Sequence, residues 1–208
     1  MRNSTILLLT LSLGACAGSQ SSSLRAPPAP IKAFPGDMLT GAIPVYPLNN
    51  MRVDSTLGMD GELSPSRDAM SRVDSMLHAV LIHRYPTAQW LTPTQLKEAA
   101  AKAPGMLTDP YDTPTMALQT HALTLIPGAL LSQMRGLAAV ASGGRYVLVP
   151  ANLWFTKTGA LTSAHLVVTL ADVRMGAVSW SGTLTGVGPD AWKAVSEAVL
   201  GVTMVKDQ

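Results

Sequence analysis

The sequence predicts an α/β fold, a single-domain sandwich in which helices cover a mixed sheet whose C-terminal half is an antiparallel meander. Two observations predict this fold. Apolar residues recur at spacings of three and four between residues 64 and 85, which indicates an amphipathic helix. The last third of the chain contains β-prone runs separated by short glycine-containing turns, which indicates consecutive strands.

The first half of the domain alternates strands and helices. "GAIPVYPLNN" (41–50) is an apolar stretch that ends in turn-forming residues, so it predicts a strand. The first helix is expected to have Ser64 as its N-cap and Pro65 at its first position, and to end near Tyr85. "TAQWL" (87–91) predicts a second short strand.

Three further segments complete the middle of the chain. Residues 92–95 (Thr-Pro-Thr-Gln) have the spacing of a capping box, which predicts a helix to about Lys102. Three prolines and a glycine predict that 103–115 is an ordered loop or an insertion rather than a regular element. Helical spacing returns from Met116 to Ser142, with an interruption at Pro127.

The last third predicts three strands and a closing helix. The middle strand is apolar on both faces, with Leu166, Val168 and Leu170 on one, so we expect it at the centre of its sheet. The closing helix begins after Pro189 and is expected to bury one stripe. The strands are "RYVLVPANLWF" (145–155), "AHLVVTLADVR" (164–174) and "AVSWSGTLTG" (177–186), and the inward positions of the helix are Val195, Val199 and Leu200.

The N-terminus has the layout of an export signal. Arg2 precedes the apolar run 6–13, which is far shorter than the roughly 20 residues that span a bilayer. The run leads into Leu13-Gly14-Ala15-Cys16, and Cys16 is the only cysteine, so it has no partner within the chain. The segment resembles the bacterial lipoprotein signal, in which such a lipobox precedes a cysteine that receives acyl chains. The alternative is an ordinary signal peptide cut elsewhere.

The lipobox resemblance predicts the domain organisation and the location. We expect a signal peptide (1–15), a lipidated Ser/Pro-rich tether (16–40) and a folded domain (41–208). The alternative for the tether is ordered coil packed along the domain. Ala17 stands where lipoproteins retained at the inner membrane carry Asp, so the resemblance implies an outer-membrane anchor with the domain facing the periplasm.

Composition argues against a nucleic-acid partner. The chain carries 15 basic and 13 acidic side chains, and Arg2 is the only charged residue of the predicted signal. The basic and acidic residues nearly balance, and the basic residues do not cluster in the sequence. Neutralising the phosphates of a nucleic acid needs a clustered basic face. Charged residues make up only 13% of the chain, against about 25% in a typical soluble domain. Such a surface favours contact with another protein.

No catalytic, cofactor or metal site is expected. His78 and His83 lie about 140° apart around one helix and cannot readily share a metal, and no zinc-protease spacing is present. His121 and His165 are expected to be ordinary polar side chains. Asp109 and Asp112 could hold calcium, but two carboxylates are weak evidence. Residues 142–144 (Ser-Gly-Gly) precede a strand, unlike a nucleophile elbow.

Several strings resemble one superfamily, which is shared by the amino-terminal domain of TolB, the curli secretion lipoprotein CsgG and the penicillin-binding-protein activator LpoB. They are "GAIPVYPLNN", "TAQWLTPTQLKEA", "RYVLVPANL" and "LVVTLADVRMGAVSWSGTLTG". The resemblance covers roughly residues 41–200 and implies this α/β fold, although Pro150 stands where the family often has Gly. In the last string we expect structural roles for Asp172, Gly176 and Trp180.

The sequence therefore predicts an envelope lipoprotein that acts as a tethered periplasmic protein-binding or adaptor module, without catalysis. The loop 104–116 and exposed Met and Trp side chains are the expected contact surface. The alternative is a subunit of an outer-membrane secretion complex or pore. A pore subunit would need extra alternating strands of about ten residues, and none stands out among the loops.

Overall fold

A computed structural model describes residues 33–36, 39–58, 63–120, 122–141 and 143–203. The chain divides into residues 1–30 and 31–208, and the fold below belongs to the second unit. The strands are β1 (Gly41–Pro44), β2 (Met51–Arg52), β3 (Ala88–Leu91), β4 (Tyr146–Thr158), β5 (Leu161–Asp172) and β6 (Ala177–Gly188). The α-helices are α1 (Arg67–Arg84), α2 (Pro93–Ala100), α3 (Gly128–Ala141) and α4 (Ala191–Leu200). Short 3₁₀ turns are η2 (Ser55–Leu57), η3 (Pro110–Asp112), η4 (Thr115–Gln119) and η5 (Gly201–Thr203).

The sheet confirms the predicted mixture of parallel and antiparallel pairing. Its order is β2-β4-β5-β6, with β5 antiparallel to both neighbours and β2 parallel to β4. β1 and β3 form a separate parallel pair, and the chain just after β1 joins this pair to the larger sheet through a bridge between Val45 and Leu148. The central place of β5 agrees with its two apolar faces.

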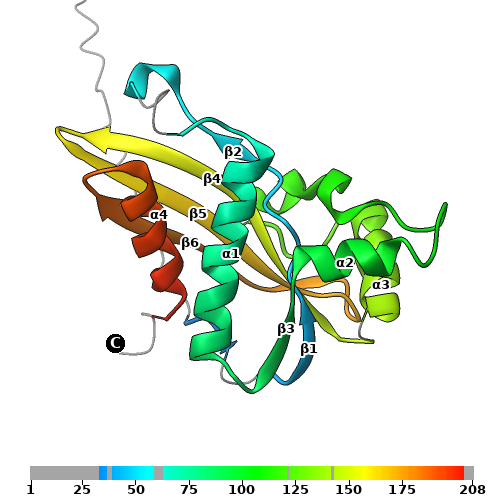
Figure 1. Cartoon of the computed structure of the whole chain (residues 1–208). Coiled ribbons are helices and arrows are strands. Elements are labelled where there is room, and N and C mark those ends of the chain that lie inside the picture. Colours follow the sequence, from blue (N-terminus) through cyan, green and yellow to red (C-terminus); the bar gives the residue numbers. More distant parts are fainter. Residues whose placement is uncertain (1–32, 37–38, 59–62, 121, 142, 204–208) are drawn as a thin grey trace, which may run out of the picture. The chain divides into compact units, whose positions relative to one another are not determined.

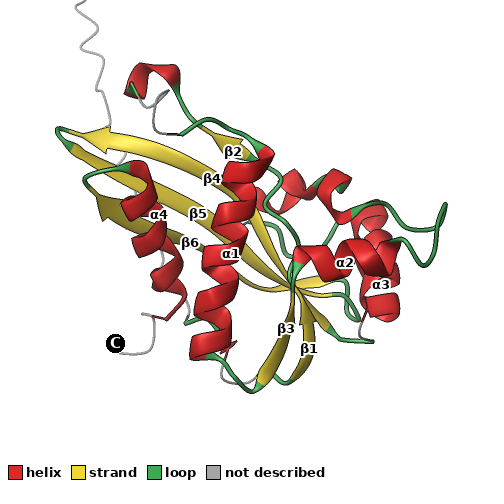
Figure 2. Cartoon of the chain, in the orientation of Figure 1, coloured by secondary structure: helices red, strands yellow, loops and turns green. Residues whose placement is uncertain are grey.

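Helices cover both faces of this sheet (Figures 1 and 2). α1 and α4 pack on one face, where Leu166, Val168 and Leu170 of β5 are buried. α2 and α3 pack on the other face, against Val167 and Ala171 of the same strand. Gly186 of β6 lets α4 approach closely, because a Cβ there would lie 2.1 Å from the Ala198 nitrogen. The α/β class predicted from sequence is confirmed.

The predicted helix termini are partly confirmed. The capping box at α2 is present, with the Thr92 hydroxyl accepting from the Gln95 N–H and the Gln95 side chain accepting from the Thr92 N–H. The prediction of Ser64 as the cap of α1 is wrong. Ser66 caps the helix instead, since its hydroxyl accepts from the Ala69 N–H at 3.1 Å.

The prediction of helix from Met116 to Pro127 is also wrong. After η4 the Leu123 N–H donates to the Thr120 carbonyl in a turn, and Leu125 then forms an antiparallel bridge with Ala177 of β6. The Ile126 N–H donates to the Gly176 carbonyl, and the Val178 N–H donates to the Thr124 carbonyl. The segment therefore covers an exposed edge of β6, and this pairing outweighs the local helical spacing.

Two smaller corrections concern the ends of the domain. Leu200 was expected to point inward, but it is 37% exposed at the last turn of α4, while Val195 and Val199 are buried as predicted. Phe34 and Leu39 lie in the range assigned to the tether, yet both are buried in the core. Ordered packing thus begins before residue 41.

Candidate functional site

Helix α1 has two faces of different chemistry, and the second one lines a groove. The apolar face packs on the sheet through Val73, Leu77 and Leu81. The other face carries polar side chains over four turns and looks toward the start of α2 and the loop containing η3. Its residues that line the groove are Arg67, Asp68, Ser71, Asp74, Ser75, His78, Ala79 and Ile82.

Asp74 is the most buried polar residue of this face. It is only 5% exposed, and its Oδ1 accepts the Leu48 N–H at 2.9 Å. That bond ties the middle of α1 to the segment after β1. Burial raises the pKa of the Asp74 carboxyl to about 7, although the Leu48 N–H and the positive charge of Arg67 both act to lower it. Asp74 is therefore a buried acid without an ion-pair partner among the described residues.

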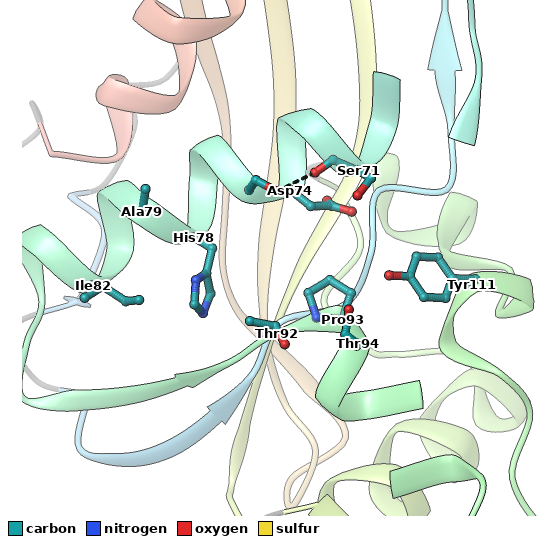
Figure 3. Close-up of a pocket in the computed structure, with 10 residues that line it drawn as sticks. Ser71, Asp74, His78, Ala79, Ile82, Thr92, Pro93, Thr94 and Tyr111 are labelled. Carbon is teal, nitrogen blue, oxygen red and sulfur yellow. Dashed lines mark hydrogen bonds between the residues drawn. The ribbon is translucent and has the colours of Figure 1, made fainter. Parts of the chain in front are cut away.

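The opposite wall is built by the start of α2 and by Tyr111. Asp74 and His78 project from α1 toward Thr92, Pro93 and Thr94, and Tyr111 turns its hydroxyl toward the same space (Figure 3). The His78 Nε2 lies 3.0 Å from the Trp90 carbonyl oxygen, so the ring is held at β3.

The loop that carries Tyr111 is fixed rather than free. The Asn49 side-chain amide donates to the carbonyls of Pro110 and Thr113 at 2.9 and 3.1 Å. The Arg67 guanidinium lies 4.8 Å from the centre of the Tyr111 ring, and the Lys97 ammonium lies 5.7 Å from it. The loop 104–116, predicted as a contact surface, therefore forms a wall of the groove.

Two adjoining hollows make up the groove. One has a volume of about 360 Å³ around Asp74 and His78, and the other about 480 Å³ around Asp109 and Asp112. Both are lined by Ser71, Thr94 and Tyr111, so the two hollows adjoin at these residues. Four aspartates line the groove (Asp68, Asp74, Asp109 and Asp112), against the two basic side chains Arg67 and Lys97. The groove is acidic, and five hydroxyl groups line it (Ser71, Ser75, Thr92, Thr94 and Tyr111).

The residues singled out from sequence lie in several places. Leu13, Gly14, Ala15, Cys16, His121 and Ser142 lie outside the described residues. Asp109 caps η3 by accepting the Tyr111 N–H and pairs with Lys97 at 3.3 Å. Within the described ranges, no group of three or more His, Cys, Asp or Glu side chains could hold a metal ion. Across those same ranges, no helix is long and apolar enough to span a bilayer.

The remaining histidines lie away from the groove's polar centre or outside it. His83 is exposed near the C-terminal end of α1. His165 of β5 stacks on Trp154 of β4 with ring centroids 5.0 Å apart. Trp90 is 5% exposed and so does not belong to the expected contact surface, and Trp180 is also 5% exposed, as its expected structural role requires. Met106, Met116 and Met175 are exposed, as expected.

Asp172 has the structural role that the sequence predicts. It is 3% exposed, its Oδ1 accepts the N–H groups of Arg174 and Met175, and its Oδ2 lies 2.6 Å from an Arg145 nitrogen. Burial alone would raise the pKa of Asp172, but the Arg145 and backbone hydrogen bonds outweigh it, so the pKa lies below its usual value. Gly176 completes the turn with φ 74°, and Trp180 meets the Phe34 ring edge-on.

Comparison with known proteins finds similar solved structures but no similar sequence family. No family model and no curated protein matches the sequence. The LpoB C-terminal domain from Salmonella enterica is 20% identical, covers 72% of this chain and 85% of its own, and has a TM-score of 0.40. A PelC dodecamer from Paraburkholderia phytofirmans is 18% identical, with coverages of 83% and 91% and a TM-score of 0.36. Lipoprotein GNA1162 from Neisseria meningitidis is 16% identical, and the match covers 70% of this chain and 78% of GNA1162 with a TM-score of 0.31.

With TM-scores of 0.31 to 0.40, these likenesses carry no conclusion for this chain. The predicted resemblance to LpoB has a counterpart among solved structures, while the resemblance to TolB and CsgG stays a prediction. Lipoproteins are among the structural neighbours. At this identity and TM-score, neither function nor oligomeric state carries over to this chain.

Proposed function

We propose that this protein is anchored by lipid at Cys16 to the outer membrane, and that its α/β domain faces the periplasm and binds another protein without catalysing a reaction. The observation that carries the proposal is the lipobox Leu13-Gly14-Ala15-Cys16, which ends an apolar run too short to span a bilayer. A cysteine with no possible partner in the chain is the residue that acylation requires. Multiple acyl chains give stable anchoring, because each buried CH₂ contributes about 0.8 kcal/mol.

The groove along α1 supports binding over catalysis. The backbone orients both titratable side chains at its centre, since Asp74 accepts the Leu48 N–H and His78 Nε2 lies 3.0 Å from the Trp90 carbonyl oxygen. The hydroxyl and charged side chains along the walls are suited to hydrogen bonding with a bound chain.

The anchor is tested by replacing the sulfur. We expect Cys16→Ser to move the protein from the outer-membrane fraction to the soluble periplasmic fraction, whereas Ser19→Ala leaves it in the membrane. Mass spectrometry of the wild-type protein should show an acylated N-terminal cysteine. Membrane fractionation of Cys16→Ser like that of the wild type, or an unacylated wild-type N-terminus, would overturn the anchoring proposal.

Protein binding is tested separately in whole cells. A photoreactive residue placed on the surface of the full-length protein should give a discrete cross-linked adduct with another protein. Native sizing in mild detergent distinguishes the alternative, because a pore or secretion-complex subunit would migrate as a ring of many copies. Self-adducts alone together with such a ring would favour the alternative over the adaptor.

A further inference from the structure

We propose that the groove along α1 binds an extended segment of a partner protein, and that Asp74 accepts the ammonium group of a lysine in that segment. This proposal rests on the protein-binding function above. It adds the surface, the conformation of the bound segment and the side chain that the domain recognises.

The length of the groove favours a peptide segment over a small molecule. The α1 residues that line it run from Arg67 to Ile82, which is 15 helical steps or about 22 Å. An extended chain rises about 3.3 Å per residue, so the groove is long enough for about seven residues. Asp74 lies near the middle of this length. At one end Ile82 is 50% exposed and offers an apolar contact.

The charge of the groove favours a cationic segment. Lys97 and Asp109 pair with each other, which leaves Asp68, Asp74 and Asp112 against Arg67. Asp68 and Asp112 are exposed and therefore partly screened by water and salt. Asp74 is not screened in this way, because it is buried below the hydroxyl-lined part of the groove. A positive charge brought to Asp74 is thus the strongest electrostatic gain available along the groove.

The surroundings of Asp74 favour lysine over arginine. One carboxylate oxygen already accepts the Leu48 N–H, so a guanidinium would have to place both N–H groups on the other oxygen, as Arg145 does at Asp172, and would lose the two-oxygen geometry that its planar fork prefers. An ammonium group is compact, sits on a thin flexible stem and has three N–H donors. One donor can reach Asp74 while the others meet hydroxyls of the same hollow, which Ser71, Ser75 and Thr92 supply.

Peptide binding tests the chemistry. The probes are acetylated and amidated heptapeptides of alanine and serine that carry lysine, arginine, acetyl-lysine or glutamate at position four, titrated into the full-length protein in detergent micelles. We expect the lysine peptide to bind at least tenfold more tightly than the other three. Asp74→Asn should abolish this preference, and it keeps an acceptor for the Leu48 N–H.

The matched control is Glu98→Gln, which likewise replaces a carboxylate by an amide, at an exposed position of α2 outside the groove. It should change the affinity for the lysine peptide by less than threefold. Absence of a lysine preference in the wild type, or an Asp74→Asn variant that binds as the wild type does, would overturn the proposal. Circular dichroism of each variant confirms that it is folded before binding is compared.

Cross-linking in cells separates this proposal from the function on which it rests. Photoreactive residues are placed at Ala79 in the groove and at Leu161, which is 49% exposed at the start of β5. An adduct from Ala79 that disappears in the Asp74→Asn background supports the groove. An adduct from Leu161 alone, or an Ala79 adduct unaffected by Asp74→Asn, overturns the groove and leaves protein binding intact. No adduct from either position counts against protein binding itself.

Discussion

Asp74 and Asp172 are two aspartates of nearly equal burial in opposite electrostatic settings. Asp74 is 5% exposed and Asp172 is 3% exposed. Asp172 accepts two backbone N–H groups and the Arg145 guanidinium, and its pKa is lowered. Asp74 accepts one backbone N–H and has no cation within ion-pair distance among the described residues, and burial raises its pKa to about 7.

The difference shows that Asp172 has a structural role, whereas the carboxylate of Asp74 can still accept a cation. The charge of Asp172 is compensated within the fold, where it closes the turn between β5 and β6. The charge of Asp74 opposes folding, because a buried carboxylate without a counter-ion carries an uncompensated desolvation cost. A neutral side chain of the same shape would serve the fold better at Asp74 and worse at Asp172.

The largest expected effect is that of Asp74→Asn on stability. The pKa of Asp74 is higher in the folded than in the unfolded chain, so its contribution to stability is fully present below pH 4 and is lost as the pH rises through about 7. The loss amounts to about 4 kcal/mol. We therefore expect Asp74→Asn to raise the free energy of unfolding by several kcal/mol at pH 8 and to have little effect at pH 4. Urea unfolding at both pH values measures this.

Asp74→Ala is the comparison variant for this measurement. It also removes the charge, but it leaves the Leu48 N–H without its acceptor. It should therefore be less stable than Asp74→Asn by about 1–3 kcal/mol at every pH. A wild-type protein whose stability does not fall between pH 4 and pH 8 relative to Asp74→Asn would show that Asp74 titrates as an ordinary exposed acid.

The same substitution at the other aspartate should act in the opposite direction. Asp172→Asn keeps an acceptor for the turn N–H groups but turns an amide toward Arg145, so we expect it to lower the free energy of unfolding by about 1–3 kcal/mol at pH 7. The pKa of Asp172 is lowered in the folded chain. The stabilisation is thus present above the unfolded pKa of about 3.9 and is lost as the pH falls through the folded pKa. Thermal unfolding at pH 7 and pH 3 checks this, and an equal deficit at both pH values would contradict it.

Much of the fold could be predicted because it follows from local pattern. The capping box at Thr92 and Gln95 satisfies backbone donors within four residues, so the start of α2 needs no tertiary information. The two apolar faces of β5 similarly predict its central place. The extended segment around Leu125 could not be predicted, because its conformation comes from pairing with β6, which is distant in the sequence.

The role of Asp172 could be predicted from the local sequence, whereas the burial of Asp74 could not. Asp172 could be predicted because it precedes a glycine turn, and a carboxylate near such a turn commonly accepts its N–H groups. Asp74 lies at the edge of the apolar stripe of α1, three residues before Leu77, but its charge predicts an exposed position. It is buried because residues 45–50 and the loop around Tyr111 close over that side of the helix. The sequence contains no local signal for that packing.

The smallest expected effect comes from supplying Asp74 with a cation. Ser71 lies three residues before Asp74 and lines the same hollow, so Ser71→Lys places an ammonium group on that side of the groove. We expect it to stabilise the protein by about 0.5–1 kcal/mol at pH 8, because position 71 is exposed. The gain should vanish at pH 4, where Asp74 is protonated.

A double-mutant cycle with Asp74→Asn isolates this interaction. Arg67 lies four residues before position 71, and its repulsion of the new lysine enters both arms of the cycle and cancels. The coupling between Lys at position 71 and Asp74 should be favourable at pH 8, and a coupling of zero would mean that the new ammonium does not reach the carboxylate. The same Ser71→Lys protein should bind the lysine heptapeptide more weakly than the wild type does, because the ammonium group at position 71 then competes with the peptide for Asp74.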